Sequence, residues 1–237
     1  MSSPKAALLT TPWRILCGSF LVLTLTACGN LLASRSPAAV TYVLRPGFVA
    51  EGAALPAAQR APEGPSQEAS SIVLQLATVG VSPGYAGADI LVTRPDRRLD
   101  VFAASRWPDE LPRVVGDLAL AALKTAGSIQ AFDATAPVAA THTLRLDVRR
   151  FDAEYRVEGT APSVHVVIDA VVTRRRDREV IARFSSATEI EASENRLSAI
   201  VAAFEKAAGE VLLMTAKQTE EALNSTPARH QGATPAP

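Results

Sequence analysis

The chain has 237 residues, with 24 lysine and arginine and 24 aspartate and glutamate residues, so its formal net charge at pH 7 is zero. This balance excludes the strong basic excess expected of a nucleic-acid-binding protein. Hydrophobic residues make up 48% of the chain, and a chain of this length can bury one substantial core. After the amino-terminal segment, no apolar run is long enough to span a bilayer.

The amino terminus has the pattern of an export signal. Lys5 and Arg14 precede an apolar run at positions 15–26, and about a dozen apolar residues is typical of a secretory signal. A transmembrane helix needs roughly 20 such residues. The run ends in Leu25-Thr26-Ala27-Cys28, which resembles the bacterial lipobox, where the cysteine thiol is acylated and becomes the first mature residue. An ordinary signal peptide or membrane anchor with an incidental cysteine is the alternative.

We therefore predict that residues 1–27 are a signal peptide and that Cys28 is the lipid attachment site. The only other cysteine, Cys17, would leave with the signal. The mature protein would then contain neither a free thiol nor a disulfide, which suits an oxidising compartment. Gly29 follows the predicted anchor, whereas many inner-membrane lipoproteins of Gram-negative bacteria carry aspartate there. This rule, which belongs to lipoproteins in general, predicts the outer membrane, with the domain in the periplasm.

Residues 28–70 are expected to form a tether and an insert. Positions 29–40 are small and polar, and positions 41–46 predict a short strand that ends at Pro46. Positions 47–70 are rich in alanine, proline and glycine and lack periodicity, which is typical of a flexible segment.

The folded domain is expected over residues 71–223. A strand at 71–79 is followed by a turn-rich segment at 80–88, and two further strands flank the turn Pro95-Asp96-Arg97. Acidic residues at Pro108-Asp109-Glu110 predict the first turn of an amphipathic helix that ends near Gly127. The apolar residues of this helix recur on one face: Leu111, Val114, Val115, Leu118 and Ala122.

Three longer strands and a second helix complete the domain. The strands are expected at 142–151, 163–173 and 179–192, with alternating apolar residues. The pair Arg149-Arg150 interrupts the first alternation and predicts a bulge. Ser193 is the expected cap of the last helix, and residues 224–237 are expected to be a disordered tail. The helix has this apolar stripe: Leu197, Ile200, Val201, Phe204, Ala208, Val211 and Leu212.

The order of elements predicts the fold class. Short turns between neighbouring strands favour antiparallel pairing. An apolar sheet face and two amphipathic helices then give an α+β fold of two layers, with a mostly antiparallel sheet and both helices packed on one face.

The sequence contains little that predicts catalysis. The three histidines, His142, His165 and His230, lack metal-ligand spacing, and neither a nucleophile elbow nor a phosphate-binding loop is present. We therefore predict that the protein is not an enzyme and needs neither cofactor nor metal. The carboxylates of the strand region are interpreted as surface solvation rather than an acid–base pair: Asp147, Asp152, Glu154, Glu158 and Asp169.

The segment 174–179, RRRDRE, is expected to form a charged hairpin tip that discourages aggregation. Contact of Arg174-Arg175-Arg176 with lipid headgroups or an acidic partner is the alternative.

An ordered series of residues lies between Val81 and Leu123. It reads Pro83-x-Tyr85, Ile90-Leu91-Val92-x-Arg94, Arg98-Leu99 and Arg106-Trp107-x-x-Glu110-Leu111. Behind a lipobox, this series resembles the hallmark segment of the ABC-type transport auxiliary lipoproteins, the PqiC family. The resemblance runs from Thr41 to Leu223, with the insert 47–70 and the tail outside it.

This resemblance implies an accessory role in the transport of lipids or other apolar molecules across the envelope. The implied partners are an MCE-domain protein and the permease and ATPase of an ABC transporter, with a lipid anchor in the membrane; self-association is left open. A lipoprotein that scaffolds an envelope complex is the second hypothesis, and an envelope hydrolase the third. The candidate contact residues belong to the series that carries the resemblance: Pro83, Tyr85, Arg94, Arg106 and Trp107. Aromatic and arginine side chains are also common interface anchors. For Trp107 the alternative is packing against the helix start.

Overall fold

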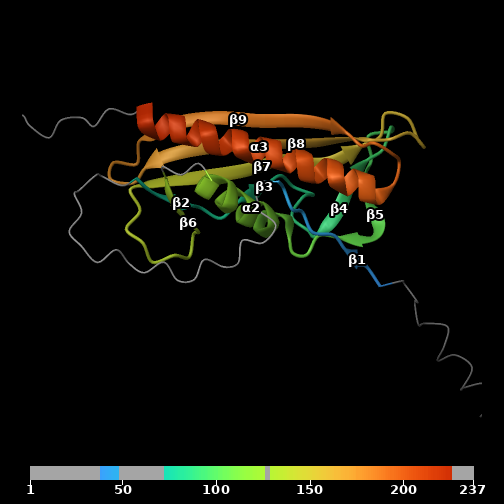
Figure 1. Ribbon diagram of the computed structural model, residues 1–237, viewed down its shortest axis with the longest axis horizontal. Helices are drawn as coiled ribbons and strands as arrows, with labels where there is room; N and C mark the ends of the chain where they lie inside the picture. The colour runs from blue at the N-terminus through green and yellow to red at the C-terminus, as the bar shows by residue number, and fades with distance from the viewer. Residues whose placement is uncertain (1–37, 48–71, 126–128, 226–237) are drawn as a thin grey trace, which may run out of the picture. The chain divides into compact units, whose positions relative to one another are not determined.

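A computed structural model describes residues 38–47, 72–125 and 129–225 of the protein (Figure 1). The predicted signal peptide, Cys28, most of the insert and nearly all of the predicted tail lie outside these residues. The strands are β1 (Val40–Thr41), β2 (Val73–Leu76), β3 (Gly80–Val81), β4 (Asp89–Thr93), β5 (Leu99–Arg106), β6 (Gln130–Phe132), β7 (His142–Glu154), β8 (Ser163–Arg174) and β9 (Val180–Glu191). The helices are α2 (Leu111–Thr125) and α3 (Leu197–Ser225).

Strand β7 is the centre of the sheet. Along one edge it pairs antiparallel with β8, which pairs antiparallel with β9. Along its other edge β7 pairs in turn with β2, β3 and β4, all in parallel. Strand β5 pairs antiparallel with β4, and β1 and β6 extend the sheet by parallel pairing with β5 and β2.

The α+β prediction is therefore confirmed, and the long ladders of the sheet are antiparallel as expected. The parallel pairs were not expected. The parallel pairs of β7 with β2, β3 and β4 arise because α2 lies in the chain between β2–β4 and β7, and a crossover through a helix returns the chain in the same direction.

The predicted bulge is present on β7. The register of β7 against β8 shifts between Val148 and Arg150. Before the bulge, Leu144, Leu146 and Val148 are buried, and after it Phe151 and Ala153 are buried. Because successive side chains of a strand point to opposite faces, the bulge places Arg150, Asp152 and Glu154 together on the face away from the helices.

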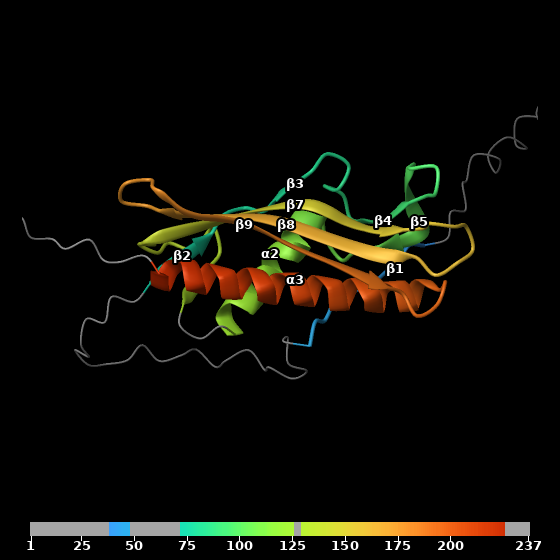
Figure 2. The same ribbon diagram turned by 90° about the horizontal axis from the view of Figure 1, so that it is seen from above.

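Both helices pack on the same face of the sheet, as predicted (Figure 2). Helix α2 begins at Leu111, one residue after the predicted acidic turn, and the Glu110 carbonyl accepts from Val114 N at 3.2 Å. Its predicted stop at Gly127 lies outside the described residues.

The predicted cap of α3 is wrong. The helix begins at Leu197, and its first turn closes on the Arg196 carbonyl, which accepts from Ile200 N at 3.0 Å. Ser193 lies in a bend before the helix, because the Ala192 N–H still bonds to the Pro162 carbonyl at 2.9 Å and continues the β8–β9 ladder. The predicted stripe of α3 is confirmed, since all its members except the half-buried Leu197 are buried.

Candidate functional site

A depression with a volume of about 560 Å³ lies where β4 and β7 end. We call it the Tyr85 depression. It is lined by Tyr85, Thr93, Arg94, Pro95, Arg97, Arg150, Glu154, Tyr155 and Arg156. Tyr85 comes from the loop between β3 and β4, whereas Arg94 and Arg97 come from the β4–β5 turn. The parallel pairing of β4 with β7 brings these distant segments together.

Asp152 lies beneath this depression and is fully buried. Its Oδ1 accepts from the Tyr85 hydroxyl at 3.1 Å, and its Oδ2 accepts from the Thr93 hydroxyl at 2.7 Å. Arg150 donates to both oxygens, from Nε at 3.1 Å and from Nη2 at 2.9 Å. The prediction that Asp152 is a solvated surface carboxylate is therefore wrong, because the loop that carries Tyr85 covers this face of β7.

Electrostatics fix the protonation states of this cluster. Burial, with the charge of Asp152 and the hydrogen bond to it, raises the pKa of Tyr85 to about 12. The hydrogen bond to Asp152 also raises the pKa of Arg150. At neutral pH, Tyr85 is therefore a protonated donor and Arg150 a permanent cation, so the phenol is unsuited to act as a base.

A second group of contacts fixes the rim. Arg94 lies 3.4 Å from Asp100 Oδ2 and 3.4 Å from Glu158 Oε2, and its guanidinium carbon lies 5.5 Å from the centre of the Tyr155 ring. The Tyr155 hydroxyl donates to Asn195 Oδ1 at 2.5 Å. These contacts join the β4–β5 turn to the segment after β7 and to the residues before α3.

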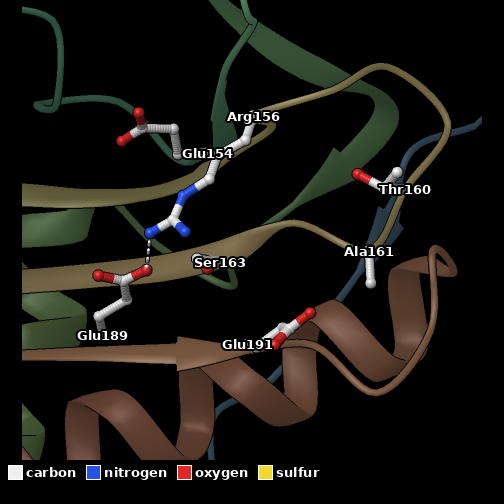
Figure 3. A pocket seen from close by; sticks show the side chains of 7 residues that line it. All are labelled: Glu154, Arg156, Thr160, Ala161, Ser163, Glu189 and Glu191. Carbon is white, nitrogen blue, oxygen red and sulfur yellow. Dashed lines mark hydrogen bonds and ion pairs between the residues drawn. The ribbon is translucent and has the colours of Figure 1, made fainter.

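A smaller hollow of about 420 Å³ adjoins the depression and shares Glu154 and Arg156 with it (Figure 3). In Figure 3, Arg156 reaches across to Glu189, where Nη2 and Oε1 are 2.8 Å apart. The adjacent His165 places its Nε2 at 3.4 Å from Glu154 and 4.0 Å from Glu189. Among the described residues, no group of three or more side chains could hold a metal ion.

The five candidate contact residues separate in the structure. Tyr85 and Arg94 line the same depression, and Pro83 is exposed in the same loop as Tyr85. Arg106 is also exposed but does not line the depression; its carbonyl accepts from Tyr42 N at 2.8 Å, beside β1.

Trp107 belongs to the core, with 1% of its surface exposed. Its ring makes edge contacts with Phe151 and Phe204, with centroids 6.0 and 5.3 Å apart. This position favours packing, the alternative considered from the sequence, and leaves no surface for a partner.

The charged tip between β8 and β9 forms ion pairs within itself. Arg174 lies 3.0 Å from Asp177 and 2.8 Å from Glu179, and Arg175 donates to Gln75 Oε1 at 2.6 Å. These contacts favour the interpretation as a hairpin tip. None of the helices in the described ranges is long and apolar enough to cross a membrane.

Two solved structures share the fold of this chain. The chain is similar to a Xanthomonas campestris protein of family DUF330, with a TM-score of 0.60 and 20% identity over 79% of this chain and 95% of the other. It is also similar to an uncharacterized protein, with a TM-score of 0.54 and 15% identity over 63% of this chain and 92% of the other. At these identities the likeness concerns the fold alone. No curated protein sequence matches the chain.

The family model of the ABC-type transport auxiliary lipoprotein component matches residues 54–213, which is more than half of the chain. The match includes most of the segment 47–70 that was expected to lie outside the resemblance. It also contains the whole series from Pro83 to Leu111 that carried that resemblance. The chain therefore belongs to the family of ABC-type transport auxiliary lipoprotein components.

Proposed function

We propose that this protein is the non-catalytic, lipid-anchored accessory subunit of an ABC transporter with an MCE-domain partner, and that the system moves lipids. Cys28 carries the anchor, which holds the domain at the periplasmic face of the outer membrane. Membership of the auxiliary lipoprotein family is the observation that carries the proposal. The lipobox supports the anchor, and glycine rather than aspartate at position 29 supports its location in the outer membrane.

The Tyr85 depression is the proposed contact surface for the transporter. Two of the candidate residues, Tyr85 and Arg94, line it, and Pro83 is exposed in the same loop as Tyr85. Their loops are held by side-chain bonds to Asp152, Asp100 and Glu158 rather than left free. A surface that is rigid before binding loses little conformational entropy when a partner docks, which favours affinity.

The chemistry of the depression supports a binding role. Tyr85 and Arg150 both donate hydrogen bonds to Asp152, and the raised pKa of Tyr85 keeps its phenol protonated. A general base must lie within hydrogen-bond reach of the proton that it abstracts from a substrate, whereas Asp152 is fully buried. The three groups here instead serve to hold the loop that carries Tyr85 onto the sheet.

Charge reversal on the exposed rim tests the contact. Arg97 is exposed in the β4–β5 turn with φ 66°, a conformation that aspartate tolerates. Arg97→Asp should leave the thermal melt unchanged and reduce co-purification of the MCE-domain partner about tenfold, since a rim charge that aligns the partner is worth about 1.4 kcal/mol.

Arg178→Asp is the matched control. Arg178 is also an exposed arginine at positive φ, 58°, in a hairpin turn, but this turn lies at the opposite end of the sheet (Figure 2). Equal partner capture by the two variants would refute the proposed surface. Capture of a β-barrel protein or peptidoglycan instead of an MCE protein would support the scaffold hypothesis.

The anchor is tested separately. Cys28→Ala should accumulate as an unprocessed precursor, because the thiol that receives the lipid is missing. Mass spectrometry of the amino terminus would detect the retained signal peptide. Normal cleavage of this variant, or recovery of the wild-type protein mainly in inner-membrane fractions, would contradict the proposed anchor or its location.

A further inference from the structure

Strand β9 forms an outer edge of the sheet (Figure 1). In the described part of the chain β9 pairs only with β8. The Ala192 N–H bonds to the Pro162 carbonyl at 2.9 Å. Since hydrogen-bonded pairs recur at every second residue of an antiparallel ladder, the even-numbered residues of β9 bond to β8. The backbone groups of Arg183, Ser185, Ala187 and Glu189 therefore point away from the sheet.

This edge lacks most of the devices by which proteins prevent edge pairing. Such devices include proline, a bulge within the exposed stretch and a very short strand. Strand β9 has twelve residues without proline, and its register against β8 is regular from Ala182 to Glu191. Its middle is the small triplet Ser185-Ser186-Ala187, which would let another strand approach closely.

Charged side chains are the remaining protective device, and two of the three on β9 have opposite signs at equal distances from Ser186. Arg183 and Glu189 lie on either side of Ser186, both exposed and both with outward backbone groups. Against an unrelated strand these charges would oppose pairing. In an antiparallel pair of two β9 strands centred on Ser186, however, Arg183 of each copy lies directly opposite Glu189 of the other.

We propose that two copies of this protein associate through their β9 edges, in antiparallel register about a twofold axis at Ser186. The two sheets then become one continuous sheet. The register exchanges backbone hydrogen bonds between Arg183 and Glu189 and between Ser185 and Ala187 of opposite copies. A twofold interface of this kind is closed and self-complementary.

Helix α3 fits the same axis. It packs on both β8 and β9, and the Thr215 hydroxyl donates to Ser186 Oγ at 3.1 Å. Strands β8 and β9 are about 4.8 Å apart, and the proposed axis lies half that distance outside β9. A helix centred between β8 and β9 is therefore about 5 Å from the axis. The two copies of α3 would then be about 10 Å apart, which is an ordinary helix packing distance. The second copy therefore does not clash with α3.

The side of α3 that faces the edge also suits a second copy. Glu210 accepts from the Thr188 hydroxyl of β9 at 3.1 Å, which places its side of the helix toward β9. Met214 follows one turn later and is 39% exposed, beside the Thr215 contact with Ser186. In the antiparallel pair of helices, Met214 meets its copy near the axis, and Glu210 faces Lys217 of the other copy.

Paired cysteines test the register in the full-length protein in cells. Apart from Cys17 and Cys28, the chain contains no cysteine. Ser185→Cys with Ala187→Cys places opposed residues about 5.5 Å apart between Cα atoms, within reach of a disulfide. A disulfide-linked dimer is expected on a non-reducing gel. Val101→Cys with Ala103→Cys is the matched control: both residues are exposed and lie two apart on β5, before the stretch at Ser105 and Arg106 that pairs with β1.

Absence of the linked dimer, or equal linkage in the β5 control, would overturn the proposal. Charge exchange provides a second measurement that does not depend on disulfide geometry. Arg183→Glu should reduce dimer formation by purified full-length protein in detergent about tenfold, since each reversal acts twice across the axis. Adding Glu189→Arg to this variant should restore the dimer.

Within one copy, Glu189 also pairs with Arg156. Arg156→Ala removes this internal ion pair alone and is therefore the control, which should dimerise normally. A monomeric wild-type protein in sedimentation equilibrium, or failure of the exchanged pair to restore a dimer at an unchanged melting temperature, would contradict the proposed interface.

Discussion

Phe151 and Asp152 are consecutive residues of β7, and both are almost fully buried, at 2% and 0% exposure. Phe151 points toward the helices and stacks on Phe204, with ring centroids 5.2 Å apart, under the edge of Trp107. Asp152 points to the opposite face and is held by the hydroxyls of Tyr85 and Thr93 and by Arg150. One strand thus separates an apolar cluster from an ionic one.

The two clusters differ in how they tolerate change. Dispersion and hydrophobic contacts are non-directional, so the aromatic cluster depends mainly on filled volume. The Asp152 cluster depends on partners at fixed distances and angles, because an unpaired buried charge is costly. Among the described residues, every buried side-chain polar atom has a hydrogen-bond partner. The aromatic cluster should therefore provide more stability, and the Asp152 cluster should determine the position of the loop with Tyr85.

The largest effect is expected from emptying the aromatic cluster. Phe204→Ala should lower the free energy of unfolding by about 4 kcal/mol, since the side chain is fully buried and its removal leaves a cavity under Trp107. Chemical denaturation measures this change. Leu213→Ala on the exposed side of α3 is the control and should cost less than about 0.5 kcal/mol. A loss below about 1 kcal/mol for Phe204→Ala would show that the helices close over the gap.

Removal of the buried carboxylate should have the next largest effect. Asp152→Ala leaves the Tyr85 and Thr93 hydroxyls without their acceptor and should lower the free energy of unfolding by about 2–3 kcal/mol. The loss stays at the low end because Arg150 is 35% exposed and keeps Glu154 at 2.7 Å. Amide exchange should also speed up locally at residues 82–88. Equal protection of this loop in the variant and the wild type would contradict its attachment through Asp152.

The buried apolar positions could be predicted from the sequence, and the Asp152 cluster only in part. The alternation of apolar residues on β7 and the apolar stripe of α3 predicted the buried positions, because the residues that face the core recur with the period of the strand or helix. The Arg149-Arg150 pair even indicated the bulge. However, the burial of Asp152 depends on the β3–β4 loop, which reaches β7 through parallel pairing across α2. That pairing has no local pattern, so Asp152 resembled any surface carboxylate.

The same limit applies to the candidate contact residues. Tyr85 and Arg94 were chosen through the family resemblance, and the structure places them in one depression. Trp107 was chosen in the same way but is a core residue, since an aromatic residue before a helix has the same sequence pattern in either role. Only the three-dimensional packing of Phe151 and Phe204 distinguishes the two.

The smallest effect concerns one hydroxyl and its dependence on pH. At pH 8, Tyr85→Phe should lower the free energy of unfolding by about 1 kcal/mol, through loss of the hydrogen bond to Asp152. The folded-state pKa of Tyr85 is raised from 10.0 to about 12. The protonated phenol therefore stabilises the fold fully below pH 10, and this contribution disappears as the pH rises toward 12, because the unfolded chain releases the proton first. The variant has no phenol to titrate, so its deficit relative to the wild type should shrink between pH 10 and 11 in urea titrations.

Thr93→Val is the matched control, since it removes the other hydroxyl bond to Asp152, at 2.7 Å, without removing a titrating group. Its deficit should stay constant over the same pH range. All three proteins contain the other tyrosines, including Tyr155, whose pKa is also raised by burial. The titration of these tyrosines therefore cancels when the stability of each variant is compared with that of the wild type. If the stability deficits of Tyr85→Phe and Thr93→Val change in parallel with pH, the titrating group lies elsewhere in the fold. The phenol of Tyr85 then holds its loop by packing rather than by its hydrogen bond to Asp152.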